Sequence, residues 1–254
     1  MKRMQGRRRS MKEKMNKIPV FYACDDNFVK YTMVSLQSMM DHASKEAQYE
    51  IHVLHTNISE EMQKKMHAME NANFSVQFDH VTEYLHSIQE KLPLRDYYSK
   101  TTYFRLFIAE MFPEIDKAIY IDSDTVVLGD IAQLYAYDLG DAYVGACREQ
   151  VMIQEEVYGT YVEKVLGVER DNYFNAGMLV INCEQFRKNH VLKQFMELLP
   201  MYNFVVTQDE DYLPQQGVLA AAEVECGSIR SDPMPRRRNL CAALYYGLKA
   251  MALQ

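Results

Sequence analysis

The sequence predicts an α/β fold in which a mainly parallel β-sheet is covered by helices. Residues 18–78 alternate between short apolar runs of strand-forming side chains and segments whose apolar residues recur at helical spacing. The order strand, helix, strand, helix, strand is typical of a parallel sheet with its connecting helices. A chain of 254 residues can bury the core of one large domain of this kind or of two small ones, and we find neither an internal repeat nor an inter-domain linker.

The first half of the chain supplies these elements in order. Strands are expected at 18–24, 49–56 and 74–78. Between them, one face of each expected helix is apolar, through Met33, Leu36 and Met40 in the first and Met62, Met66 and Met69 in the second. Ser59 is expected to cap the second helix. The polar run 25–27 ends the first strand and can cap the helix that follows.

The second half continues the pattern less regularly. A capped helix is expected at 99–107, with Tyr103, Leu106 and Phe107 on its apolar face. Strands are expected within 117–128 and at 139–146 and 173–182, and an amphipathic helix carries Leu192, Phe195, Met196 and Leu199. Beyond Leu213 we find no strand or helix period.

Two carboxylates interrupt the stretch 117–128, which is apolar before and after them and is interpreted as a buried strand that ends in a site. Side chains alternate along an extended strand, so Asp122 and Asp124 are expected on one side and Ser123 on the other. Neighbouring carboxylates repel and burial raises the cost, so the pair needs a cation or a shared proton. Hard oxygen ligands of this kind suit Mg²⁺ or Mn²⁺, which also bind substrate phosphates. A strand that ends in an acidic turn is the alternative.

Other polar residues are candidates for the same site. Ligands of parallel sheets bind beyond the carboxyl ends of the strands, which places Asp25 and Asn27 at the rim that carries the carboxylate pair. Arg105 is either a bidentate phosphate ligand or a solvated surface side chain. Asn175 precedes Gly177 in an apolar strand, where glycine allows a ligand or the backbone to approach closely or simply marks a bend.

The composition excludes several classes of protein. A formal net charge of -7 argues against a general nucleic-acid-binding protein, and we find no apolar run of the roughly 18 residues that a membrane span needs. The basic residues 1–17 lack the apolar segment of a secretory signal, so we expect a disordered leader or, alternatively, peripheral docking on an anionic membrane surface. The five cysteines are scattered without C-x-x-C spacing, which favours the cytoplasm over a disulfide framework or a zinc site.

Four ordered motifs resemble glycosyltransferase family 8, the retaining transferases that include bacterial lipopolysaccharide glucosyl- and galactosyltransferases and, more distantly, glycogenin. They are ACDDN at 23–27, TTYFRL at 101–106, IYIDSD at 119–124 and YFNAG at 173–177. The resemblance covers roughly residues 18–213. It implies a Rossmann-like nucleotide-diphosphate-sugar transferase fold with a mixed, mainly parallel sheet. It also implies a divalent metal, usually Mn²⁺, and transfer of a hexose from a UDP-sugar to a glycan or glycolipid acceptor with retained configuration.

The resemblance further implies roles for individual residues. Contacts to the nucleotide and donor sugar would come from Ala23, Asp25, Asn27, Arg105, Asn175, Ala176 and Gly177. Asp122 and Asp124, with Ser123 between them, would hold the metal. Asp209 and Glu210 would flank the reacting centre as catalytic residues.

Two departures from the family pattern set the alternatives. Relatives often have an amide where Glu210 stands. In the family a late histidine completes the metal site, and the most similar segment here, LYYGLKAM at 244–251, has leucine in place of that histidine. We therefore expect residues 214–254 to form an atypical, poorly ordered tail, and a catalytically impaired nucleotide-sugar-binding paralogue is the non-enzyme alternative. Residues 122–126 also match the opening motif of haloacid-dehalogenase-like phosphatases, in which the first Asp is a nucleophile. In those enzymes that strand normally opens the core, whereas here it follows a full β-α-β-α-β unit.

Overall fold

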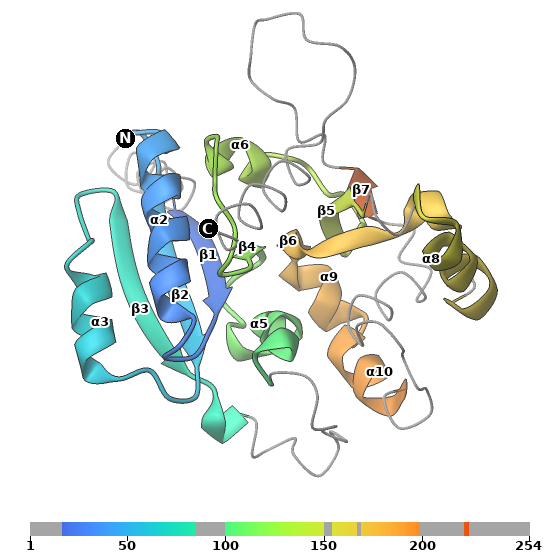
Figure 1. Ribbon diagram of the computed structural model, residues 1–254, viewed down its shortest axis with the longest axis horizontal. Coiled ribbons are helices and arrows are strands. Elements are labelled where there is room, and N and C mark those ends of the chain that lie inside the picture. The colour runs from blue at the N-terminus through green and yellow to red at the C-terminus, as the bar shows by residue number, and fades with distance from the viewer. Residues whose placement is uncertain (1–16, 85–99, 150–153, 167–168, 199–220, 224–254) are drawn as a thin grey trace, which may run out of the picture.

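The computed structural model describes residues 17–84, 100–149, 154–166, 169–198 and 221–223 (Figure 1). The first part of the chain forms β1 (Lys17–Ala23), α2 (Val29–His42), β2 (Gln48–His55), α3 (Glu60–His67) and β3 (Phe74–His80). The middle forms η2 (Lys100–Tyr103), α5 (Phe104–Met111), β4 (Lys117–Ile121), α6 (Ile131–Tyr135) and β5 (Val144–Arg148). The last part forms α8 (Glu156–Tyr161), η3 (Val162–Leu166), η4 (Arg170–Asn172), β6 (Phe174–Asn182), α9 (Cys183–Lys188), α10 (Val191–Leu198) and β7 (Ala221–Glu223).

The described strands form one seven-stranded sheet in the order β3-β2-β1-β4-β6-β5-β7. Strands β1 to β4 pair in parallel, whereas β6 runs antiparallel to both β4 and β5, and β7 is parallel to β5. The predicted mixed, mainly parallel α/β fold is confirmed, including the opening alternation of strands and helices from β1 to β3.

Alternate residues of the central strands face two separate cores. In β4, Ile119 and Ile121 pack into the core beneath α2 and α3. Ala118 and Tyr120 pack into the opposite core, which contains α5, α9 and α10. Helices therefore cover both faces of the sheet, which explains why the central strands are apolar on both sides.

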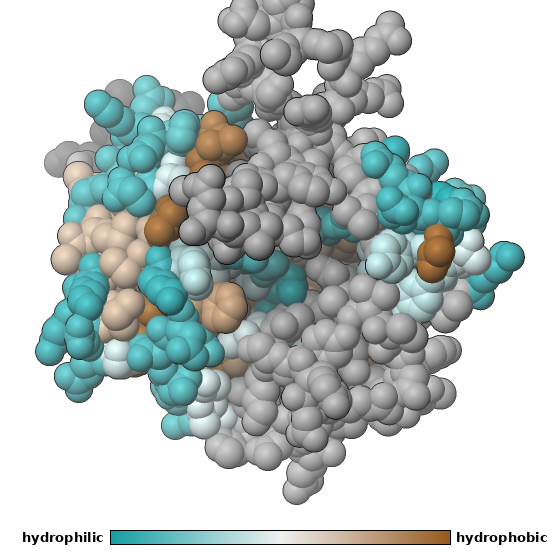
Figure 2. All heavy atoms as spheres, in the orientation of Figure 1, coloured by the Kyte–Doolittle hydropathy of each residue, from teal (hydrophilic) through white to brown (hydrophobic). Residues whose placement is uncertain are grey.

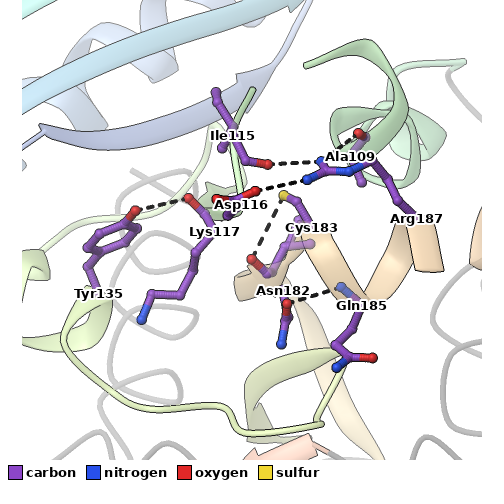
Figure 3. Close-up of polar contacts among 10 residues, drawn as sticks. Ala109, Ile115, Asp116, Lys117, Tyr135, Asn182, Cys183, Gln185 and Arg187 are labelled. Atoms are coloured by element: carbon purple, nitrogen blue, oxygen red, sulfur yellow. Dashed lines mark hydrogen bonds and ion pairs between the residues drawn. The ribbon is translucent and has the colours of Figure 1, made fainter. Parts of the chain in front are cut away.

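A polar brace at the amino end of β4 fixes the strand to its neighbouring helices (Figure 3). The guanidinium of Arg187 on α9 donates to the carbonyl oxygens of Ala109 and Ile115 at 3.0 and 2.9 Å. It also donates to Asp116 Oδ1 at 3.1 Å. On the other side of the strand, the Tyr135 hydroxyl donates to the carbonyl oxygen of Lys117 at 3.1 Å. The brace lies at the end of β4 opposite to the predicted site.

On the face shown in Figure 2, hydrophilic side chains cover much of the described surface, a continuous pale-brown area of moderate hydropathy lies on the left, and smaller brown patches lie elsewhere. The large apolar side chains that are most exposed include Val34 on α2 and Val157 on α8. No helix among the described residues is long and apolar enough to cross a membrane.

The strand expected at 139–146 begins later, because β5 spans Val144–Arg148, and two other details of the fold also differ from the sequence prediction. The edge strand β7 lies beyond Leu213, where no strand period was found; a strand of three residues is too short to show one. Cys147 is disulfide-bonded, whereas Cys24 and Cys183 are free and buried, so the cysteine spacing gave no warning of a bond at Cys147.

Candidate active site

The predicted site residues that lie in the described part of the chain are found at one edge of the sheet. The carboxyl ends of β1, β4 and β5 meet the amino end of β6 there, because β6 runs antiparallel to its two neighbours. Ala23 is the last residue of β1 and the loop 24–27 follows it, the acidic pair follows β4, and Asn175 is the second residue of β6. This is the rim that the sequence predicted.

The acidic pair lies on a turn and not on the strand that was predicted to carry it. β4 ends at Ile121, and the Thr125 amide donates to the carbonyl oxygen of Asp122 at 3.3 Å. The alternation of the strand continues for two residues. Asp122 lies on the side of Tyr120, whose hydroxyl donates to Asp122 Oδ1 at 2.7 Å, and Ser123 lies on the side of α2. The prediction that Ser123 faces away from Asp122 is therefore confirmed.

The two carboxylates of the turn act on each other. Asp122 is half-buried, and Asp124 is exposed. The surrounding protein raises the pKa of Asp124 by desolvation, and the charge of Asp122 raises it further. A bound cation would relieve both costs, because it stabilises the ionised form of each carboxyl.

Arg105 is buried next to the acidic turn. Its side chain is 5% exposed, because α5 is buried along most of its length and its apolar residues pack into the core. The guanidinium carbon lies 5.0 Å from the centroid of the Tyr120 ring, and Nη1 lies 3.7 Å from Asp122 Oδ1. Nη1 also donates to the carbonyl oxygen of Ala176. The interpretation of Arg105 as a solvated surface side chain is therefore wrong.

A bulge in β6 brings backbone groups to these side chains. Ala146 pairs with Leu179, but the next residue of β5, Cys147, pairs with Asn175, so the register skips residues 176–178. Bulges of this kind redirect the groups that they carry. Within the bulge, the Gly177 carbonyl oxygen accepts from the Asp122 amide at 2.7 Å, and the Gly177 amide donates to Asn175 Oδ1 at 2.8 Å.

Gly177 allows the close approach that the sequence suggested. A Cβ atom at this position would lie 2.6 Å from Asp122 Oδ2 and 3.0 Å from Asn175 Oδ1. Both distances are shorter than ordinary van der Waals contacts, so the glycine is required by the packing of the Asp122 carboxylate against the bulge. A simple bend would not make this demand.

The loop after β1 is held by its own carboxylates. Asp25 Oδ1 accepts from the amides of Asn27 and Phe28 at 2.9 and 3.0 Å. Asp26 Oδ1 accepts from the Ser59 amide and hydroxyl at 2.9 and 2.8 Å. The hydrogen bond from the amide, and to a smaller extent the one from the hydroxyl, holds the pKa of Asp26 below its ordinary value. Ser59 precedes α3 as predicted, but its hydroxyl makes no cap hydrogen bond and donates to the loop instead.

A buried hydroxyl pair connects this loop to the acidic turn. Thr32 on α2 is fully buried, and its hydroxyl donates to Ser123 Oγ at 2.9 Å. The Ser123 hydroxyl donates in turn to the carbonyl oxygen of Ala23 at 3.3 Å. The backbone ends of β1 and β4 are thus tied through side chains from α2 and the turn.

The acidic turn fits a hard divalent cation only in part. Asp122 and Asp124 offer carboxylate oxygens, and ions such as Mg²⁺ and Mn²⁺ bind through one or two carboxylates together with phosphates and water. In the described part of the chain, no group of three or more His, Cys, Asp or Glu side chains could hold a metal ion. A metal here would therefore depend on its substrate and on water for its remaining ligands.

The remaining predicted residues lie outside this description. Asp209 and Glu210 are outside the described residues, as are residues 1–16 and, apart from β7, the tail 214–254. Sequence reasoning missed Tyr120, Thr32 and Glu149, whose carboxylate accepts from Asn175 Nδ2 at 2.7 Å. Tyr120 could have been found, because it stands two residues before Asp122 and shares its side of the strand.

A sequence model of one protein family matches most of the chain and decides the family. The model of glycosyl transferase family 8 matches residues 19–219. The chain belongs to glycosyltransferase family 8. This match includes all four motifs and residues Asp209 and Glu210, and it leaves no support for the phosphatase alternative.

Solved structures share the fold of this family 8 chain. The bifunctional glycosyltransferase WbbM, in its apo form, has a TM-score of 0.72 and 27% identity, covering 83% of this chain and 39% of its own. The galactosyltransferase LgtC, solved with donor and acceptor sugar analogues, has a TM-score of 0.65 and 27% identity, covering 78% of this chain and 70% of its own.

A curated relative from Haemophilus influenzae, provisionally named a glycosyltransferase, is 29% identical over 197 residues. The alignment covers 76% of this chain and 57% of the relative, so the chain spans little more than half of that protein.

Proposed function

We propose that this chain is a metal-dependent retaining glycosyltransferase that moves a hexose from a UDP-sugar to a glycan or lipopolysaccharide-type acceptor. The proposal rests on one observation: the buried guanidinium of Arg105 lies 3.7 Å from the Asp122 carboxylate. Both residues lie inside the region that matches the family. A buried cation beside a carboxylate pair suits a diphosphate with its metal. The choice of acceptor is supported by a relative, 26% identical over 110 residues, named lipopolysaccharide 1,2-glucosyltransferase in Escherichia coli.

Asp122 and Asp124 are the residues that would hold Mn²⁺ or Mg²⁺. Such an ion, when bound, neutralises charge on the departing diphosphate. The Tyr120 hydroxyl and the Gly177 backbone fix Asp122 from two directions, at 2.7 Å each. The carboxylate is therefore oriented before any ligand arrives, and less conformational freedom is lost on binding.

Arg105 would bind the donor's phosphates or sugar hydroxyls. A guanidinium presents several N–H groups in a planar fork, which matches phosphate oxygens better than an ammonium group does. The contacts of Arg105 with Ala176 and Tyr120 hold the guanidinium in place beside the acidic turn. Asp25 uses Oδ1 for backbone amides, and its second oxygen would accept from the uridine or ribose of the donor.

The reacting centre would lie against Asp209 and Glu210. A carboxylate at Glu210 can stabilise an oxocarbenium-like centre or attack it, whereas an amide offers only its carbonyl oxygen. We place the activity at the cytoplasmic face of a membrane, where the basic residues 1–17 would attract the chain to anionic lipid.

The test measures UDP release from UDP-glucose and UDP-galactose with Mn²⁺, with Mg²⁺ and with a chelator. We expect metal-dependent release, and NMR of the product should show the anomeric configuration of the donor. Asp122→Asn and Asp124→Asn should each weaken metal-dependent donor binding by at least about tenfold, because a neutral amide is a poor substitute for a charged ligand. Asp41→Asn, at an exposed position on α2, is the matched control.

Two outcomes would replace the proposal. Donor binding without UDP release, in the presence of a range of glycan acceptors, would identify a nucleotide-sugar-binding paralogue. Unchanged metal-dependent binding in both asparagine variants would show that the acidic turn is not the metal site.

A further inference from the structure

A carboxylate outside the predicted set lies beside the bulge in β6. Glu149 follows β5, and its amide donates to the carbonyl oxygen of Tyr173 at 3.1 Å, which extends the pairing with β6 past the last residue of the strand. Its backbone is thereby fixed opposite the start of β6. From this position its half-buried side chain reaches Asn175, where Oε2 accepts from Nδ2 at 2.7 Å.

The hydrogen bonds of Asn175 require one orientation of its amide. Nδ2 donates to Glu149, and Oδ1 accepts from the Gly177 amide at 2.8 Å. A flipped amide would place Oδ1 against the Glu149 carboxylate and Nδ2 against the Gly177 N–H. Both contacts would then be repulsive, because acceptor would meet acceptor and donor would meet donor. Glu149 and Gly177 therefore select the same orientation of the Asn175 amide.

The orientation of Asn175 passes to the acidic turn through Gly177. The Gly177 carbonyl oxygen accepts from the Asp122 amide, and its α-carbon lies so close to Asp122 Oδ2 that a Cβ would be 2.6 Å away. Any rotation of the Gly177 peptide therefore moves the backbone or the carboxylate of Asp122. The amide of Asn175 also has a second Nδ2 hydrogen, and the same orientation leaves this donor for a ligand oxygen.

We propose that Glu149 is a positioning residue, which orients the Asn175 amide and through it holds the Gly177 bulge against Asp122. The role requires an acceptor oxygen at position 149 and not a negative charge. The effect on donor binding rests on the function proposed above, whereas the effect on Gly177 belongs to the free protein.

The experiment compares wild type with Glu149→Ala, Glu149→Gln and the control Glu155→Ala, whose carboxylate is exposed and makes no cap hydrogen bond. The first readout is the backbone amide of Gly177 and the side-chain amide of Asn175 in NMR spectra of the ¹⁵N-labelled free protein. In Glu149→Ala we expect both resonances to shift and the Gly177 N–H to exchange about tenfold faster, since about 1.4 kcal/mol, or tenfold, lies within the range of hydrogen-bond contributions. Glu149→Gln can still accept from Nδ2 and should keep the wild-type pattern, as should Glu155→Ala.

The second readout is the affinity for a UDP-hexose with saturating Mn²⁺. We expect about tenfold weaker binding in Glu149→Ala and a change of less than about threefold in Glu149→Gln. An unmoved Gly177 resonance in Glu149→Ala would overturn the proposal. Equal losses in the two Glu149 variants would also overturn it, because charge and not orientation would then be the property that matters. Absence of donor binding in the wild type would refute the proposed function alone, since the Gly177 readout does not depend on a donor.

Discussion

Replacing Gly177 with alanine tests the packing of the acidic turn most directly. The new Cβ would lie 2.6 Å from Asp122 Oδ2, whereas ordinary contacts begin at 3.4 Å, so the two groups must separate by 0.8 Å, the difference of these values. The carboxylate cannot move away freely, because Tyr120 and the Gly177 carbonyl oxygen both hold Asp122 at 2.7 Å. Overpacking of this kind costs about 1–3 kcal/mol.

That cost should appear in two measurements. The melting temperature should fall by about 2–12 °C, since 1 kcal/mol corresponds to about 2–4 °C in a domain of this size. Calorimetry should show that affinity for Mn²⁺ and UDP-hexose falls by about tenfold to a hundredfold, because the displaced carboxylate is also the proposed ligand.

Gly129→Ala is the matched control, because no atom lies within 4 Å of a Cβ built at that glycine. It should retain both the stability and the affinity of the wild type. If Gly177→Ala keeps the melting temperature and the affinity of Gly129→Ala, the bulge accommodates the added methyl group without cost, and the proposed packing of Asp122 against Gly177 is refuted.

Three further substitutions probe other contacts. Arg105→Lys should weaken UDP-hexose binding by about tenfold in calorimetry, because an ammonium group cannot bond to Ala176 and present a planar fork at once. Thr32→Val should lower the free energy of unfolding by about 1–2 kcal/mol in urea titrations, because the buried Ser123 Oγ then loses the hydrogen bond that the Thr32 hydroxyl donates to it. Without metal, Asp124→Asn should melt about 1–3 °C above wild type at pH 7, a gain that stays small because Asp124 is exposed and solvent screens its charge. The raised pKa means that folding penalises the ionised Asp124, so this gain should vanish below about pH 4, where the carboxyl is protonated in both states.

Each of these has its own control. Arg187→Lys, in the brace at the opposite end of β4, should lower stability without affecting donor binding. Thr32→Ser keeps the hydroxyl and should stay close to wild type. For Asp124→Asn, a gain in melting temperature that persists unchanged at low pH would show that desolvation of the charge is not its cause.

The sequence predicted most of the fold because its strands and helices differ in period. The alternation from β1 to β3 and the apolar strands β4 and β6 follow from local patterns that tertiary packing does not override. Arg105 shows where such reasoning fails: spacing cannot reveal that the helix carrying it is almost wholly buried. The turn at Asp122 was interpreted as strand, because strand ends depend on hydrogen bonds that a pattern does not contain.

Partners from distant parts of the chain were harder to anticipate. Glu149 stands beside no motif, and it reaches Asn175 only because β6 bulges at residues 176–178. The bond between Asp26 and Ser59 joins the ends of β1 and the start of α3 across a sequence separation of 33 residues. Contacts of this kind depend on how elements meet and not on their own composition.

The alternation of β4 has a consequence for how the acidic turn responds to change. Because Asp122 is held from the α5 side by Tyr120 and Ser123 from the α2 side by Thr32, each core supports the turn through a different residue. Substitutions that repack one core should disturb the carboxylate, and those that repack the other should disturb the turn's backbone. The sequence of the core on one face of the sheet can therefore change while the core on the other face still supports its own residue of the turn.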